Sequence, residues 1–169
     1  VRLGAVADRV LQAHGYPDGV SAITGEALAI ASMLGASLKF EGVLTLQTRG
    51  SGSLRMVVAD FSSPGVVRAC AAFDKDKSLP TPFGELHGEG SFALTIDQGA
   101  EMERYQGIVP LSPDGLAASA LEYFRQSEQI PTAMRVAAAP MVLREADGKL
   151  RRHWRAGGIM IQNMAALGG

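Results

Sequence analysis

Cysteine is nearly missing from this chain, which has only Cys70 among its 169 residues. One cysteine excludes an internal disulfide framework and any zinc site built from several cysteines of this chain. Neither sign of charge predominates, because 16 Lys and Arg stand against 17 Asp and Glu, for a net charge of −1. The chain therefore has no electrostatic footprint for a nucleic acid or an acidic membrane. The absence of structural disulfides is compatible with a reducing cytoplasm, where we expect the protein to reside.

The sequence also lacks the features of a membrane or exported protein. Its most apolar stretch, residues 27–38, is shorter than the ~20 residues that a membrane span needs, and Glu26 and Lys39 flank it. No basic start followed by an apolar run predicts a signal peptide. Because the chain begins with Val1 rather than Met, we interpret it as a soluble piece of a longer protein.

What the sequence does contain is enough apolar residues, 47%, to form one globular domain. Residues 21–37 predict a helix whose apolar positions cover its whole circumference, which is typical of a buried helix. A short amphipathic helix is expected over residues 3–13. Alternating apolar residues predict strands at 43–48, 54–61, 66–73, 91–96, 105–111, 132–138, 141–146, 150–154 and 159–164. Without a regular strand–helix rhythm, the predicted class is α+β with mostly antiparallel strands.

Capping and turn residues predict where two further elements begin and end. Ser112 and Pro113 predict the N-cap and first turn of a second amphipathic helix, and Pro131 predicts its end. The pair Asp147-Gly148 predicts a two-residue hairpin turn between neighbouring strands.

Residues that could support catalysis or metal binding are scattered along the chain. His14, His87 and His153 have no i, i+4 spacing, so we interpret each as a surface or loop histidine. Cys70 lies between alanines in a predicted strand, which favours a small buried side chain. A thiol enzyme with Cys70 as nucleophile and His87 as base stays open as an alternative.

One basic run, RRHWR at residues 151–155, carries an aromatic residue and could contact phosphate groups. In a strand that follows a hairpin turn, Arg151, His153 and Arg155 would face solvent and Trp154 would face inward. We therefore expect no nucleic-acid partner, and an RNA-binding module that uses Arg151 to Arg155 is kept as a second alternative.

Four blocks of sequence, in this order, resemble a known chaperone family. They are GEALA (25–29) with SLKFEG (37–42), TIDQG (95–99) with ERYQGIV (103–109), YFRQSEQIPT (123–132), and AGGIMIQ (156–162). Together they resemble the redox-regulated 33 kDa heat-shock chaperones, heat shock protein 33, over nearly the whole chain. The third block, with its aromatic pair and polar run, is the most specific.

The resemblance implies an ATP-independent holdase, which is a chaperone that binds unfolding proteins, here called clients. In that family a domain with a layered β/β/α arrangement around a buried helix precedes a helical linker and a zinc module. Oxidation of four zinc-bound cysteines releases the metal, unfolds the linker and uncovers apolar surface, and the active forms are dimers. This chain has no such module, and Cys70 does not correspond to a switch cysteine. We therefore expect residues 1–169 to form the N-terminal client-binding domain, with no cofactor, no zinc and no catalytic residues.

The resemblance also suggests where clients bind, because flexible and polarizable methionine side chains suit a promiscuous apolar surface. On the last predicted strand, Met160 and Met164 share one face, whereas Ile159 and Ile161 share the other. We predict that the Met160 face binds clients, joined by Met134 and Val136. The alternative, that these methionines fill gaps in the core, stays open.

Overall fold

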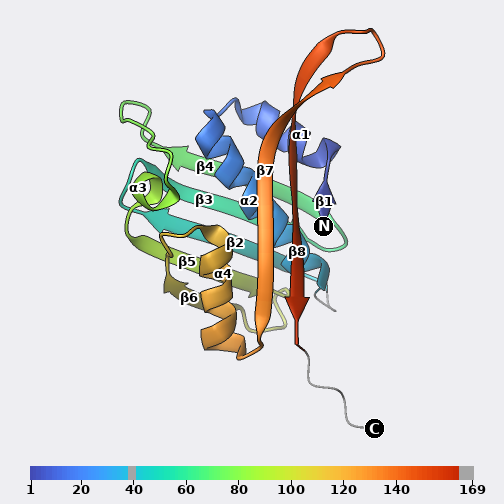
Figure 1. Ribbon diagram of the computed structural model, residues 1–169. Coiled ribbons are helices and arrows are strands. Elements are labelled where there is room, and N and C mark those ends of the chain that lie inside the picture. Colours follow the sequence, from blue (N-terminus) through green and yellow to red (C-terminus); the bar gives the residue numbers. More distant parts are fainter. Residues whose placement is uncertain (38–40, 164–169) are drawn as a thin grey trace.

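The computed structural model describes residues 1–37 and 41–163, which form two antiparallel sheets with helices between them (Figure 1). The larger sheet has the order β4 (Val66–Phe73), β3 (Leu54–Ser62), β2 (Val43–Gly50), β5 (Gly90–Asp97) and β6 (Tyr105–Pro110). The smaller sheet has the order β1 (Arg2–Leu3), β8 (Leu150–Gln162) and β7 (Thr132–Arg144). The helices are α1 (Ala5–His14), α2 (Asp18–Ser37), α3 (Phe83–His87) and α4 (Leu116–Tyr123), and a π-helical turn (Phe124–Glu128) continues α4. The α+β class predicted from the sequence is confirmed.

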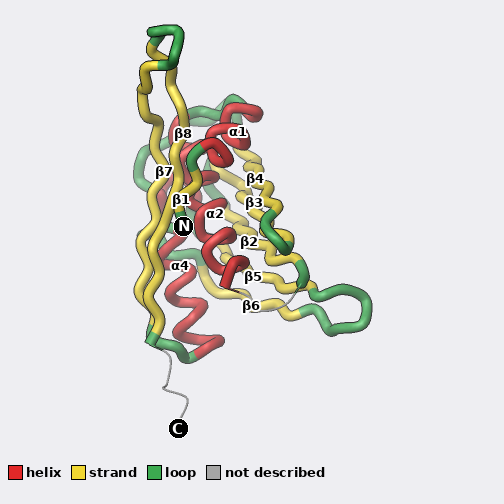
Figure 2. Tube along the Cα trace, turned by 90° about the vertical axis from the view of Figure 1, so that its right-hand side faces the viewer, coloured by secondary structure: helices red, strands yellow, loops and turns green. Residues whose placement is uncertain are grey.

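Helix α2 is the centre of the core and lies between the two sheets (Figure 2). Residues 27–35 are all buried, as the apolar circumference predicts. Small residues bring the smaller sheet close, because a Cβ added at Gly25 would lie 2.7 Å from the Cβ of Ala138. Thr24 and Ser32 donate hydrogen bonds of 2.7 Å to carbonyls of their own helix, so neither buried hydroxyl is left without a partner. By length and composition α2 could cross a membrane, but 78% of its apolar window is buried inside the domain.

Strands β7 and β8 are each continuous, where the sequence predicts four shorter strands. Pro140 does not interrupt β7, because its nitrogen faces the edge of the strand that bonds no neighbour. Gly157 does not interrupt β8, because it pairs with Arg2 of β1, and a Cβ there would lie 2.9 Å from the carbonyl oxygen of Val1. Pro140 and Gly157, which suggested breaks between shorter strands, are therefore both compatible with continuous strands.

The predicted start of the second amphipathic helix is wrong. Helix α4 begins only at Leu116, and Gly115 with φ 117° is its N-cap, a conformation that favours glycine. Ser112 instead accepts a hydrogen bond of 3.2 Å from the backbone N–H of Asp114, which forms a local turn before the helix. A serine hydroxyl can cap a helix or a turn, and the sequence alone does not separate the two.

The predicted hairpin turn is present but longer. Glu145 N–H donates to the Lys149 carbonyl at 2.8 Å, and Gly148 has φ 78°, so the loop has three residues rather than two. The first helix is displaced too, because Leu3 belongs to β1 and α1 begins at Ala5.

The histidine predictions are only partly correct. His14 is exposed, but it also covers the edge of β4, where its Nε2 donates to the Ala69 carbonyl at 2.8 Å. His87 is fully buried at 0% exposed, with Nε2 2.7 Å from the Thr48 hydroxyl, and burial lowers its pKa. Its Nδ1 has no partner within residues 1–37 and 41–163. The prediction of a surface or loop position for His87 is therefore wrong.

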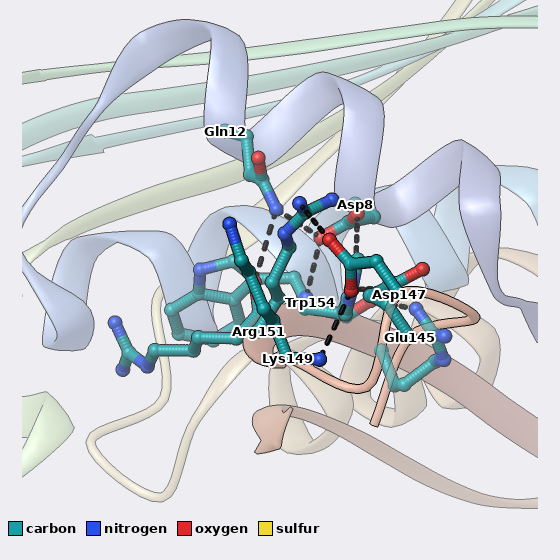
Figure 3. Close-up of polar contacts among 10 residues, drawn as sticks. Asp8, Gln12, Glu145, Asp147, Lys149, Arg151 and Trp154 are labelled. Carbon is teal, nitrogen blue, oxygen red and sulfur yellow. Dashed lines mark hydrogen bonds and ion pairs between the residues drawn. The ribbon is translucent and has the colours of Figure 1, made fainter. Parts of the chain in front are cut away.

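His153 is half-buried in β8 and bonds both Asp8 of α1 and Glu145 at the start of the hairpin loop, two residues that are labelled in Figure 3. Its Nδ1 lies 2.7 Å from Asp8 Oδ2 and its Nε2 lies 2.5 Å from Glu145 Oε1. Both nitrogens need a proton to donate, so hydrogen bonds to Asp8 and Glu145 raise the pKa of His153. Burial alone would raise the pKa of Asp8. Hydrogen bonds from His153, the Trp154 N–H and Gln12 outweigh it and lower that pKa instead.

Replacing Ala31 by aspartate should strongly destabilise the domain. Ala31 is 0% exposed, so Ala31→Asp places a carboxyl group without a partner in the centre of the core. We expect a loss of at least about 3 kcal/mol in the free energy of unfolding, measured by urea denaturation. Ala5→Asp at the exposed start of α1 is the control and should change stability by less than about 0.5 kcal/mol. An Ala31→Asp protein as stable as the parent would contradict the position of α2.

His153→Gln should destabilise the domain in a pH-dependent way. Because the pKa of His153 is higher in the folded chain, its stabilisation is complete below its unfolded value of about 6.5 and is lost as the pH rises through the folded value. Thermal unfolding from pH 5.5 to 8.5 should show the largest difference from the parent at the acidic end. His14→Gln, which removes an exposed histidine, is the control. A difference that is constant with pH would rule out the charged bridge.

Candidate functional site

The four residues predicted as a binding surface do not form one exposed patch. Met134 is 1% exposed and belongs to the core, and it pairs across the strands with Met160, which is half-buried. Val136 is also half-buried and packs against the core. Met164 lies outside the described residues. The structure thus brings three of the four residues together on the inner face of the smaller sheet, and places Met134 in the core. Their role in client binding stays a prediction.

Met160 also lines an apolar cleft of about 260 Å³ between the two sheets. Leu44 and Leu94 line it from the larger sheet, and Tyr123 and Glu128 line it from α4 and the turn that follows. Tyr123 donates a hydrogen bond of 3.3 Å to Glu128 Oε1. Burial raises the pKa of Tyr123, and neighbouring Tyr105 and Glu128 raise it further, so the phenol keeps its proton. The cleft has room for one or two apolar side chains beside a carboxylate.

The outer face of the smaller sheet carries two strongly exposed apolar side chains. Ile159 is 63% exposed and Ile161 is 66% exposed, and they lie opposite Arg135 and Ala133 of β7. Figure 2 shows no helix or strand of the described chain against this face. An exposed pair of isoleucines on a sheet without a cover is a candidate interaction surface.

The exposed face of β8 is the one opposite to the predicted Met160 face, for a physical reason. A period of two separates the faces of a strand but does not say which face is buried. Small inward residues such as Ala138 and Ala156, which allow close contact with α2, are the signal that identifies the inner face.

The end of the β7–β8 hairpin projects beyond the rest of the domain (Figure 1), and it carries further exposed apolar side chains. Val142 and Leu150 are exposed near the loop, and Met141 is exposed beside them. This part of the hairpin lies beyond the helices, so these side chains have few neighbours within the domain. Alternation in the sequence predicts strands here but not their exposure, because the projection depends on strand length.

The Cys70 prediction is wrong, because Cys70 is exposed on the outer face of β4 and its neighbour Ala69 is the buried residue. Alanines on both sides of Cys70 gave no information on which face is covered. The structure does not bring Cys70 to His87, which is enclosed beside Thr48 on the other face of the sheet. Cys70 instead borders a shallow depression with His14 and Arg68. This arrangement offers no nucleophile–base pair.

Two arginines of the basic run have acidic partners. Arg151 pairs with Asp147 at 2.8 Å, and Arg152 pairs with Asp18 at 2.6 Å. Trp154 faces inward as predicted, and Arg152 lies 5.4 Å from the centre of its ring. Because ion pairs compensate two of the three arginines, the strand presents little free positive charge for phosphate groups.

The described residues contain no group of three or more His, Cys, Asp or Glu that could hold a metal ion. The features that remain are apolar, namely a cleft lined by Met160 and an exposed face that carries Ile159 and Ile161. Such features can bind apolar side chains.

Comparisons with known proteins agree with this picture. A family model described as Hsp33 protein matches residues 1–168. The 33 kDa chaperonin of Caulobacter vibrioides is 44% identical over 172 residues, which cover 98% of this chain and 55% of that protein. The 33 kDa chaperonin of Shewanella frigidimarina is 35% identical and covers 100% of this chain and 54% of that protein.

A solved structure has the same fold. The crystal structure of the 33 kDa chaperonin from Thermotoga maritima matches with a TM-score of 0.71 and 25% identity, over 94% of this chain and 54% of that chain. The present chain thus spans about half the length of the curated relatives and of the solved protein. Because the family model matches nearly all of its residues, the chain belongs to the Hsp33 protein family.

Proposed function

We propose that this chain is the client-binding domain of an ATP-independent holdase chaperone. Membership of the Hsp33 family and the chaperonin names of its relatives support a chaperone function. The observation that carries the proposal is the uncovered apolar face with Ile159 and Ile161, which are 63% and 66% exposed. A folded protein hides its apolar segments, so such a face binds proteins that are unfolding.

The physical properties of this face suit many clients. A client segment that buries ~400 Å² of apolar area gains roughly 10 kcal/mol before the cost of association is subtracted. Apolar contact has little directionality, so binding should be moderate and weakly sequence-selective. Arg135 and Arg155 border the isoleucines but donate to carbonyls of their own strands, which leaves the apolar contact dominant.

We further propose that redox regulation and zinc binding belong to the part of the longer protein that this chain does not include. The residues described here do not fit zinc, because they contain no cluster of metal-binding side chains and Cys70 is the chain's sole cysteine. On their own, residues 1–169 would then bind clients without oxidation.

The chain should suppress the aggregation of a heat-denaturing client enzyme under fully reducing conditions and without ATP. Replacing both Ile159 and Ile161 by glutamate should remove at least half of this activity, because charged side chains would then occupy the apolar face. Light scattering measures the aggregation. Val66→Glu is the control, because Val66 is also 63% exposed but lies on the larger sheet, and it should leave the activity unchanged.

The possible results of this assay are distinct. A parent chain that is folded and monomeric but leaves aggregation unchanged would exclude the holdase function. An active parent with equally active double and Val66 variants would exclude only the outer face. Replacement of Met160 by glutamate, measured alongside, tests the predicted inner face.

The purified chain should also bind no stoichiometric zinc after mild dialysis. The reason is that a structural zinc site needs about four ligands with nitrogen or sulfur donors, and the described residues gather no such set. Elemental analysis measures the metal content. One tightly held zinc per chain would contradict the assignment of metal binding to the rest of the longer protein.

A further inference from the structure

Within residues 1–37 and 41–163, strand β7 has one edge without a neighbouring strand. In the smaller sheet it lies at the end of the order β1–β8–β7, so it pairs with β8 alone. The unpaired edge is 13 residues long, from Thr132 to Arg144. A long free strand edge offers backbone donors and acceptors to another extended chain.

The hydrogen bonds at both ends of β7 identify the residues that face this edge. Pro131 accepts from the Asn163 N–H at 2.9 Å, and the Glu145 N–H donates to Lys149 at 2.8 Å. In an antiparallel pair the bonded residues alternate, so odd-numbered residues of β7 bond β8. The backbone groups of the even-numbered residues Met134, Val136, Ala138 and Val142 therefore point to the free edge, and Pro140 there lacks an N–H.

The outer edges of β8 and β4 are covered, whereas β6, the end strand of the larger sheet, has a free edge like that of β7 but is only six residues long. On β8, Trp154 N–H donates to Asp8 and Gly158 N–H donates to the Val1 carbonyl. On β4, Ala71 N–H donates to the Tyr16 hydroxyl at 3.1 Å.

On the free edge of β7, the Met134 carbonyl accepts from Arg135 at 2.9 Å. Val136, Ala138 and Val142 have no backbone partner at this edge in the described part of the chain. Their donors and acceptors are thus available to a ligand.

A groove of about 650 Å³ borders the start of the same strand. Ala118, Leu121 and the Glu122–Arg125 ion pair form one wall. Ile130, Pro131 and Thr132 form the other, where the chain enters β7. In Figure 1, α4 lies beside β7 on the side away from β8. A strand added along β7 would therefore direct alternate side chains toward the half-buried Leu121.

We propose that an extended segment of an unfolded client binds as a fourth strand of the smaller sheet, along the free edge of β7, with alternate apolar side chains in the groove beside α4. Backbone pairing does not depend on side-chain identity, so it suits clients of any sequence. The β7 strand of a second copy is a poorer fit, because it would bring its own α4 to the same edge. This inference rests on the proposed holdase function and names the form in which the client binds.

Amide hydrogen exchange of the folded chain, measured by NMR, tests the inference. The probe is reduced and carboxymethylated α-lactalbumin, which stays unfolded. Saturating probe should slow the exchange of the Val136, Ala138 and Val142 amides at least tenfold. The Gln106 and Ile108 amides of β6, which is an end strand of the larger sheet, should change little.

A substitution in the groove gives a second readout. Ala118→Gln places a longer side chain in the groove and keeps a good helix former, so it should weaken probe binding at least threefold. Ala13→Gln on the exposed surface of α1 is the matched control and should bind like the parent. Thermal unfolding checks that both variants are folded.

Three results would overturn the strand-addition proposal. Probe binding without slower exchange on β7 would overturn it and leave the holdase function in place. Protection of β7 that grows with protein concentration in the absence of probe would make a second copy the occupant. Failure of the folded parent both to bind the probe and to suppress aggregation would remove the holdase function and this inference together.

Discussion

The packing of α2 between two sheets is the constraint on which the rest of the structure depends. A helix that is apolar all round must be covered on all sides, and neither sheet alone can do this. The larger sheet covers one side, and the smaller sheet approaches closely over Gly25 on the other. Leu28 and Ile30, both 0% exposed, each contribute roughly 1.5–3 kcal/mol by burial. The outer faces of both sheets are then left to solvent or partners.

Local sequence rules predicted much of this fold because they describe local physics. The apolar circumference of α2 and the alternation in β2 to β5 correspond to buried and half-buried elements, and these were identified within a few residues. These rules failed where contacts between residues far apart in the sequence determine whether a strand continues. Pro140 is tolerated because its nitrogen faces the free edge of β7, and Gly157 is needed because β1 arrives beside it. Neither the free edge at Pro140 nor the strand beside Gly157 can be predicted from residues that are close in the sequence.

Which face of β8 is exposed was harder to predict for a related reason. Both faces of β8 are apolar, with Met160 on one and Ile159 on the other, so composition did not separate core from surface. The same ambiguity applied to Cys70, which has an alanine on each side. In each case the buried face is the one that a helix covers, and the helix reaches that face only when the layers of the domain are assembled.

The pairing of β1 with β8 has a consequence for folding during synthesis on the ribosome. Arg2 and Leu3 find their partners only at Gly157 and Ala156, near the other end of the chain. Between the end of α2 and the end of β8 lie roughly 125 residues, or about 6–25 s of synthesis at ~5–20 residues per second. During that time the most apolar helix of the domain lacks at least one of its two covers, because β2 to β6 also follow it in the chain. A domain proposed to hold other unfolding chains is thus itself an exposed, incomplete chain for most of its own synthesis.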